Sequence, residues 1–302
     1  MLIFLRILAA LALAAGVACV AFLWLTRPEP VDPARYAGLT GDAGRGEAVF
    51  WAGGCASCHA AEGAEGEDRL ILSGGRAFPS DFGTFHAPNI SSDPDAGIGG
   101  WSVEDLGSAM QAGVSPGGEH YYPAFPYTSY ARAAPQDIVD LHAFLATLPA
   151  SDAPNVPHDI GFPFSVRALL GGWKMLFLDT DFVLQGDQPD TVARGRYLAE
   201  ALAHCGECHT PRNALGGAEL DRWLGGAPNP SGQGRIPNIT PGGLDWSEND
   251  IAAYLKSGFT PEFDSAGGEM AEVVANLSHL SDADRAAIAA YLKAVPAVRE
   301  GE

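Results

Sequence analysis

The chain has 302 residues, of which 47% are hydrophobic and 18% are charged, a composition typical of a globular protein and not of a disordered one. The length allows one large domain or two small ones. The formal net charge of −19 argues against a nucleic-acid partner, because phosphates are bound by Lys and Arg. The same charge disfavours anionic lipid headgroups and favours a partner with a basic surface.

The N-terminus begins with a long apolar segment. Residues 7–26 contain no charge, and twenty helical residues span about 30 Å, the thickness of the hydrocarbon layer of a bilayer. Small residues at 12–14 and 16–18 are alternative signal-peptide cleavage sites, but the apolar run continues beyond both. We therefore expect residues 1–27 to be an uncleaved transmembrane anchor, followed by a linker at residues 28–40.

Much of the remaining sequence occurs twice. The motif C-x-x-C-H stands at residues 55–59 and again, 150 residues later, at residues 205–209. A Pro-Asn-Ile segment and a Trp-Ser pair follow each copy; they begin at Pro88, Pro237, Trp101 and Trp246. Such a repeat predicts two structural units of the same kind. We expect domains at 41–150 and 191–302, joined by a packed connector at 151–190.

Both repeats predict helices. Ser102 and Ser247 each precede an acidic residue three positions on, which is the pattern of a helix N-terminal capping box. Strand patterns are nearly absent, so the fold class is predicted to be all-α, with long loops rich in Gly and Pro. The glycines expected to end the two capped helices are Gly113 and Gly258.

The C-x-x-C-H motifs indicate covalent haem. Two thiols one helical turn apart can each bond to a haem vinyl group, and the following His can then ligate the iron. Zinc would require further Cys or His nearby, and a redox dithiol would require a preceding strand; a disulfide is the third alternative. Because the motif recurs at matching positions of a repeat, we expect two covalently bound haem c groups. The residues expected to hold them are Cys55, Cys58, His59, Cys205, Cys208 and His209.

The sixth iron ligand is expected to differ between the repeats. Met270 lies in a Gly-rich polar segment between two predicted helices, and we expect it to be the distal ligand of the second haem. Phe125 stands at the matching position of the first repeat and cannot ligate iron. His120 is then the best substitute and His86 a weaker one, while an open, five-coordinate iron is a further alternative. The methionines expected to serve only in packing are Met110 and Met175.

These residues resemble class I cytochromes c. Gly46 and Phe50 match the first helix of that family, and Phe144 and Tyr291 match the last helix, which crosses the first one in the family fold. The resemblance implies two tandem class I cytochrome c domains after an N-terminal transmembrane helix. The family also has a Pro-Asn segment whose proline carbonyl holds the proximal His; the matching residues here are Pro88-Asn89 and Pro237-Asn238.

Residues 43–297 are also similar to the membrane-bound multihaem cytochrome subunits of periplasmic dehydrogenases for gluconate, alcohols, aldehydes and sugars. The segments that carry this similarity are Ala87-Pro88-Asn89-Ile90, Gly113-Val114-Ser115-Pro116, Tyr122-Pro123-Ala124-Phe125-Pro126-Tyr127 and residues 205–213. The resemblance implies electron transfer from a periplasmic dehydrogenase to the respiratory chain, with haem domains in the periplasm and the anchor in the inner membrane.

The resemblance does not identify the dehydrogenase, and a small basic cytochrome is an alternative partner. On this interpretation the chain is not an enzyme by itself. Two other functions stay open at this point. One is a dihaem peroxidase-like enzyme with an open first haem, and the other is a dihaem subunit of a terminal oxidase.

Overall fold

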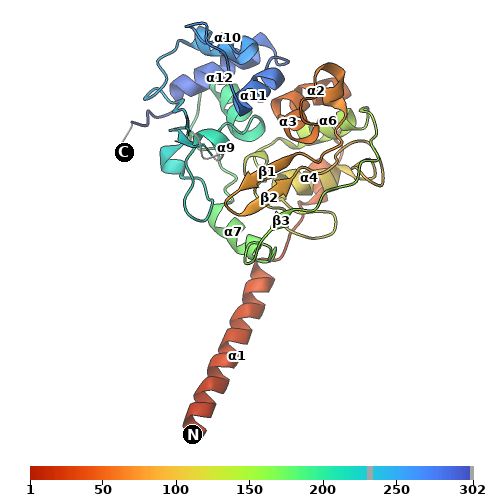
Figure 1. Ribbon diagram of the computed structural model, residues 1–302, viewed down its shortest axis with the longest axis vertical. Coiled ribbons are helices and arrows are strands. Elements are labelled where there is room, and N and C mark those ends of the chain that lie inside the picture. The colour runs from red at the N-terminus through yellow and green to blue at the C-terminus, as the bar shows by residue number, and fades with distance from the viewer. Residues whose placement is uncertain (230–233, 300–302) are drawn as a thin grey trace.

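The computed structural model describes residues 1–229 and 234–299. A long N-terminal helix projects from a body in which the remaining helices are joined by long loops (Figure 1). The α-helices are α1 Leu2–Leu25, α2 Ala43–Ala52, α3 Cys55–His59, α4 Val103–Ala112, α5 Tyr127–Tyr130, α6 Pro135–Leu145, α7 Leu169–Phe177, α8 Asp190–Tyr197, α9 Gly206–His209, α10 Glu248–Ser257, α11 Glu269–Leu277 and α12 Asp282–Ala294. The short 3-10 and π turns are η1 Pro33–Tyr36, η2 Gly66–Leu70, η3 Leu198–Leu202 and η4 Leu220–Arg222.

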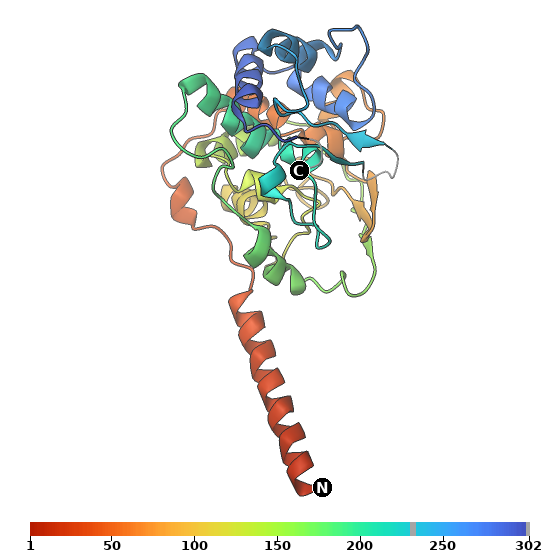
Figure 2. The ribbon, with the colours of Figure 1, turned by 90° about the vertical axis from the view of Figure 1, so that its left-hand side faces the viewer.

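Helix α1 has 24 residues and a mean hydropathy of 2.5, and none of its residues is buried. Among the described residues it is the one helix that is long and apolar enough to cross a membrane. It extends away from the body in both views (Figures 1 and 2). At its end, Thr26 is 5% exposed, so the chain passes from α1 directly into the body.

Short strands occur in the loops that follow each C-x-x-C-H motif and in the connector. They are β1 Ala77–Ser80, β2 Gly83–His86, β3 Asp159–Ile160, β4 Ala227–Pro228 and β5 Arg235–Ile236. The first three form an antiparallel sheet in the order β1-β2-β3, and the last two form an antiparallel pair. The sequence predicted almost no strands. The observed strands are two to four residues long and mostly exposed or half-buried, so they have no buried apolar face that a sequence pattern would display.

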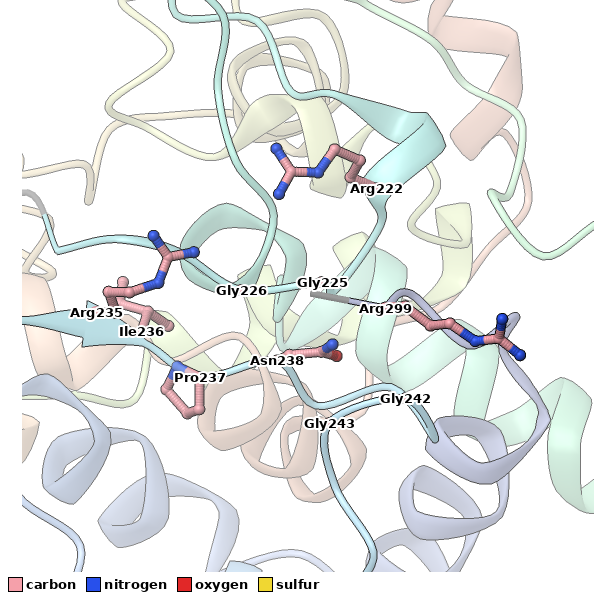
Figure 3. A pocket seen from close by; sticks show the side chains of 10 residues that line it. All are labelled: Arg222, Gly225, Gly226, Arg235, Ile236, Pro237, Asn238, Gly242, Gly243 and Arg299. Atoms are coloured by element: carbon pink, nitrogen blue, oxygen red, sulfur yellow. The ribbon is translucent and has the colours of Figure 1, made fainter. Parts of the chain in front are cut away.

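A basic pocket of about 940 Å³ lies beside β5 (Figure 3). Arg222, Arg235 and Arg299 contribute their side chains to its lining, together with Pro237 and Asn238. No acidic residue is among the described residues that line it. Three guanidinium groups around one cavity favour anions, which is unusual for a chain with a net charge of −19.

The predicted helix ends are confirmed. Ser102 and Ser247 each form a complete capping box with the acidic residue three positions later. Gly113 and Gly258 end α4 and α10 with φ of 59° and 76°, a backbone conformation that glycine adopts without steric cost.

Helices α2 and α6 cross at a glycine. A Cβ atom at Gly46 would lie 2.0 Å from the carbonyl oxygen of Asp140, so only glycine permits this close approach. Four residues later, Phe50 packs on Phe144 with 5.2 Å between ring centroids. Helices α8 and α12 repeat the crossing at Gly195, where a Cβ would lie 1.8 Å from the carbonyl oxygen of Ala287. The crossing expected from the class I resemblance is thereby confirmed.

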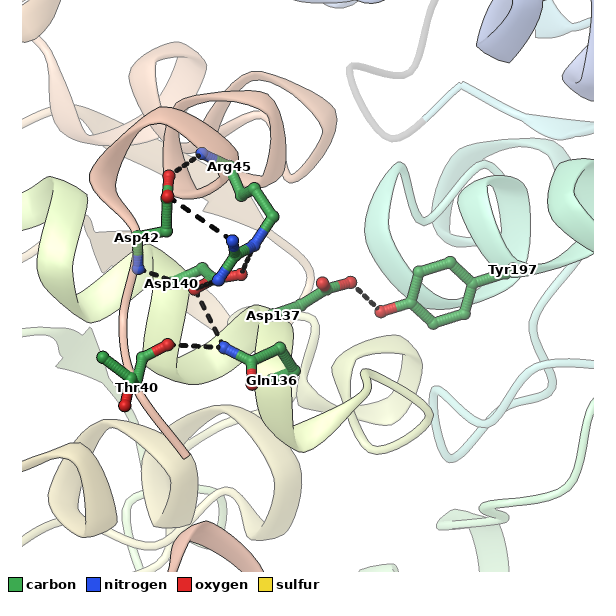
Figure 4. Close-up of polar contacts among 7 residues, drawn as sticks. All are labelled: Thr40, Asp42, Arg45, Gln136, Asp137, Asp140 and Tyr197. Carbon is green, nitrogen blue, oxygen red and sulfur yellow. Dashed lines mark hydrogen bonds and ion pairs between the residues drawn. The ribbon is translucent and has the colours of Figure 1, made fainter. Parts of the chain in front are cut away.

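A buried carboxylate holds the first crossing together (Figure 4). Asp140 is 0% exposed and accepts two hydrogen bonds from Arg45, at 2.7 and 2.8 Å. It also accepts the backbone N–H of Asp42 at 2.8 Å and the side-chain amide of Gln136 at 2.9 Å. Burial by itself would raise the pKa of Asp140, but these donors outweigh it and lower the pKa.

The connector contacts both repeats. Lys174 donates to the carbonyl oxygen of Ala112 at 2.7 Å, and the indole of Trp173 donates to that of Leu215 at 2.9 Å. The expectation that Met175 serves in packing is wrong, because this residue is 66% exposed. Hydrogen bonds from Trp173 and Lys174 hold α7 on the body, and Met175 lies on a side of this helix that stays exposed in the described structure.

Candidate haem sites

The first C-x-x-C-H motif forms the short helix α3. The Nδ1 atom of His59 donates to the carbonyl oxygen of Pro88 at 2.8 Å, and the N–H of Gly74 donates to the carbonyl oxygen of His59, also at 2.8 Å. A Cβ at Gly74 would lie 2.4 Å from the carbonyl carbon of Pro88. Glycine therefore allows the proline segment to approach the histidine.

The second motif has the same geometry. His209 donates from Nδ1 to the carbonyl oxygen of Pro237 at 2.8 Å. The N–H of Gly226 donates to the carbonyl oxygen of His209 at 2.8 Å, and a Cβ at Gly226 would lie 2.8 Å from the backbone nitrogen of Asn238. The proline contact implied by the class I resemblance is present in both repeats, although 29 and 28 residues separate the partners.

These contacts prepare both histidines as ligands. A proton held on Nδ1 by a carbonyl leaves the lone pair of Nε2 free for a metal. Burial lowers the pKa of both His59 and His209, against the smaller opposing effect of the proline carbonyl. The imidazoles are therefore neutral at pH 7, as metal coordination requires.

The cysteines fit covalent attachment better than the alternatives. None of the four is in a disulfide. Burial raises the pKa of Cys55 and of Cys205 to about 12, whereas a redox dithiol needs a stabilised thiolate. No group of three or more His, Cys, Asp or Glu side chains suited to a metal ion occurs within residues 1–229 and 234–299.

Met270 is the second residue of α11 and packs, partly buried, against the main hydrophobic cluster. The sequence placed it in a loop, whereas the structure begins a helix at Glu269. At the matching position of the first repeat, Phe125 lies between aromatic rings, 5.9 Å from Tyr121 and 5.7 Å from Tyr130. The two repeats therefore present different chemistry at this position, a thioether and a phenyl ring.

His120, the predicted substitute ligand of the first haem, lies at the end of α1, and its role as a ligand stays a prediction. His120 is 5% exposed, and its Nε2 atom donates to the carbonyl oxygen of Thr26 at 2.8 Å. That hydrogen bond places His120 at the end of α1, while its buried Nδ1 atom has no hydrogen-bond partner among the described residues. Sequence reasoning could not detect this contact, since 94 residues separate its partners and neither residue belongs to a motif.

The two C-x-x-C-H turns are tied to the opposite repeat. Ser57, between the first pair of cysteines, accepts a hydrogen bond of 2.5 Å from Asn276 of α11. Glu207, between the second pair, accepts a hydrogen bond of 2.7 Å from Thr128 of α5. Helices α5 and α11 hold matching positions in the two repeats, so the contacts are reciprocal. Nothing in the sequence indicated them.

The comparisons with known proteins agree with this geometry. Residues 43–149 and 192–296 each match the cytochrome c family. A "Diheme cytochrome c-type" of Cereibacter sphaeroides is 63% identical over 96% of this chain and 97% of its own length. The fructose dehydrogenase cytochrome subunit of Gluconobacter japonicus is 38% identical over 91% of this chain. The cytochrome c subunit of an alcohol dehydrogenase (quinone) of Gluconobacter oxydans is 38% identical over 85% of it.

The chain spans 57% and 55% of the lengths of these two dehydrogenase subunits, but nearly the whole dihaem relative. The repeated motif, the repeated proline contact and the two matched segments lead to one conclusion: the chain belongs to the cytochrome c family and carries two covalently bound haem c groups.

Proposed function

We propose that this chain is an electron-transfer subunit. Cys55 and Cys58 would bind one haem and Cys205 and Cys208 the other. The proximal ligands would be His59 and His209, with Met270 as the distal ligand of the second haem. Haem iron supplies reversible one-electron chemistry; the protein fixes the ligands, the exposure and the distance between the two sites.

The observation that carries this proposal is the reciprocal contact between the two haem-binding turns. Asn276 holds the turn at Ser57, and Thr128 holds the turn at Glu207. Each contact reaches the residue between two haem-binding cysteines, so the turns are fixed relative to each other. A chain built in this way suits passage of electrons from one site to the other, because distance and orientation stay constant.

The relatives support a dehydrogenase as the electron donor. Those named as cytochrome subunits belong to fructose, alcohol and gluconate dehydrogenases. We propose that a periplasmic dehydrogenase reduces one haem and that the other passes electrons to the respiratory chain. We also propose that α1 is an anchor in the inner membrane and that the haem domains lie in the periplasm; its length and unburied apolar surface support this.

Near-infrared magnetic circular dichroism and EPR of the oxidised full-length protein test the ligands. We expect one low-spin haem with His and Met ligands, which the Met270→Leu variant would lose. The same preparation is assayed with hydrogen peroxide, and no turnover is expected. Peroxide turnover together with a high-spin first haem would overturn electron transfer as the sole function and favour a peroxidase-like enzyme. That outcome would fit Phe125 at the first site.

A further inference from the structure

Large apolar side chains are exposed on the part of the body next to α1. Helix α7 lies beside the end of α1 in both views (Figures 1 and 2). On α7 and the segment just before it, six apolar residues remain 40–86% exposed: Phe162, Phe164, Val166, Leu169, Met175 and Leu176. We call these six residues the apolar rim. Single exposed apolar residues are ordinary, but a contiguous group marks an interaction surface.

The junction between α1 and the body is rigid. The carbonyl oxygen of Thr26 accepts the hydrogen bond from His120, and His120 is itself held at its carbonyl oxygen by Arg167 at 2.7 Å. A Cβ at Gly171 would lie 2.2 Å from the same Thr26 oxygen. Two glycines of α7 thus approach the end of α1 closely, since a Cβ at Gly172 would lie 3.0 Å from the ring of Phe22.

The contact with Phe22 fixes the depth of α7. A helix of 24 residues is about 36 Å long at 1.5 Å per residue, whereas the hydrocarbon layer is about 30 Å thick. With α1 across the bilayer, Phe22 and Trp24 therefore lie at its surface, where Trp side chains are enriched. Because α7 approaches Phe22 closely at Gly172, this part of α7 lies at the same depth, at a surface into which amphipathic helices insert.

We propose that the apolar rim inserts into the headgroup region of the bilayer, so that the body rests on the membrane through α7 and residues 162–166. This inference rests on the proposed function only in that α1 must be a membrane anchor. Lipid is the favoured occupant because α7, which carries half of the rim, approaches Phe22 at the end of the apolar helix α1. The attraction is hydrophobic, and zwitterionic lipid is sufficient, because a chain with a net charge of −19 gains nothing from anionic headgroups.

Spin labels test this in the full-length haem-loaded protein reconstituted into phosphatidylcholine liposomes. In a Cys19→Ala background, a single cysteine is introduced by Leu176→Cys, Phe263→Cys or Leu13→Cys. Phe263 is 88% exposed and belongs to the segment that joins α10 to α11, two helices that lie at the opposite end of the body from α1 (Figure 1). Leu13 lies within α1. Each nitroxide is scored by its accessibility to oxygen divided by its accessibility to a water-soluble nickel complex.

We expect labels at 13 and 176 to give a ratio severalfold higher than the label at 263, with Met175→Cys as the replacement if Leu176→Cys does not retain both haems. If position 176 behaves like position 263 while position 13 is in lipid, the anchor stands and the proposed rim insertion is wrong. If position 13 is also in water, the anchor itself is wrong, and the rim insertion is rejected with it.

Discussion

Met270 and Phe125 occupy matching positions, and we predict that this difference separates the potentials of the two haems. Replacing Met270 by Leu removes the proposed sulfur ligand, and Met ligation raises the potential of a haem. We expect one step of a potentiometric titration to fall by on the order of 100 mV, within the roughly 0.8 V range that axial ligands span. Met175→Leu is the matched control, since Met175 is mostly exposed. A shift of equal size in the control, or none in Met270→Leu, would reject the assignment.

Asp140 predicts a pH-dependent stability. Its pKa is lowered in the folded state, so its contribution is present above the unfolded pKa of about 3.9 and is lost as the pH falls through the lower folded value. Asp140→Asn is therefore expected to lower the free energy of unfolding by about 2 kcal/mol at pH 7. The difference in the free energy of unfolding between the variant and the wild type should narrow below about pH 4. Denaturant unfolding at pH 7 and below about pH 4 measures this difference, and a difference that does not change with pH would contradict the prediction.

At this scale the sequence predicted the residues of local motifs and missed most long-range partners. The C-x-x-C-H residues could be identified because their chemistry lies in the residue type. The assignment of Met270 rests on the same ground and stays a prediction. The proline carbonyls of Pro88 and Pro237 came only from a family resemblance, because a loop of almost thirty residues sets no distance. The contact of His120 with Thr26 was not foreseen, since packing between distant segments sets it.

The crossing helices predict which glycines resist substitution. Gly46→Ala and Gly195→Ala each place a methyl group within about 2 Å of a backbone carbonyl on the partner helix, and overpacking of this kind costs about 1–3 kcal/mol or more. We expect thermal denaturation at clearly lower temperature for both variants. Gly117→Ala is the control, because the nearest atom to its Cβ is a side-chain oxygen 3.7 Å away. Unchanged stability of Gly46→Ala would mean that the crossing relaxes easily.

Helices were more predictable than the segments between them. Capping boxes at Ser102 and Ser247 and glycine stops at Gly113 and Gly258 depend on neighbours within one or two turns, which the sequence displays. The strands β1 to β5 and the exposure of α7 depend on where the loops fold back in space. Their sequences carry no periodic pattern, so the same reasoning did not reach them.

For the whole molecule, the reciprocal contacts predict that the two haem-binding turns act as one unit. Asn276→Leu removes the hydrogen bond to Ser57 and the one that Asn276 accepts from Arg69 at 2.8 Å. We expect a loss of about 1–3 kcal/mol of stability and slower electron exchange between the haems after partial photoreduction. Lys256→Ala, which breaks an exposed pair with Asp282, should change neither. Normal exchange in Asn276→Leu would show that the contact does not set the geometry.

The acidic charge of the first domain predicts that its binding to a partner depends on salt. Residues 41–150 contain fourteen acidic and four basic residues, so this domain favours a partner whose docking surface is basic. Binding of a small basic cytochrome to the full-length protein should therefore weaken as salt rises from 50 to 500 mM by roughly an order of magnitude, as screening of exposed charges requires. Surface plasmon resonance at several salt concentrations measures this, and salt-independent binding would argue for an apolar contact.

The buried junction at Thr26 also limits how the molecule can search for partners. A domain on a flexible linker would tumble above the membrane and present every face in turn. Here the carbonyl oxygen of Thr26 is bonded to His120, and α7 packs against Phe22, so the domains and α1 turn together. With α1 in the bilayer, the molecule rotates only about an axis along the membrane normal. Soluble partners then approach only the faces turned away from the lipid, and membrane partners meet this protein by lateral diffusion at a fixed height.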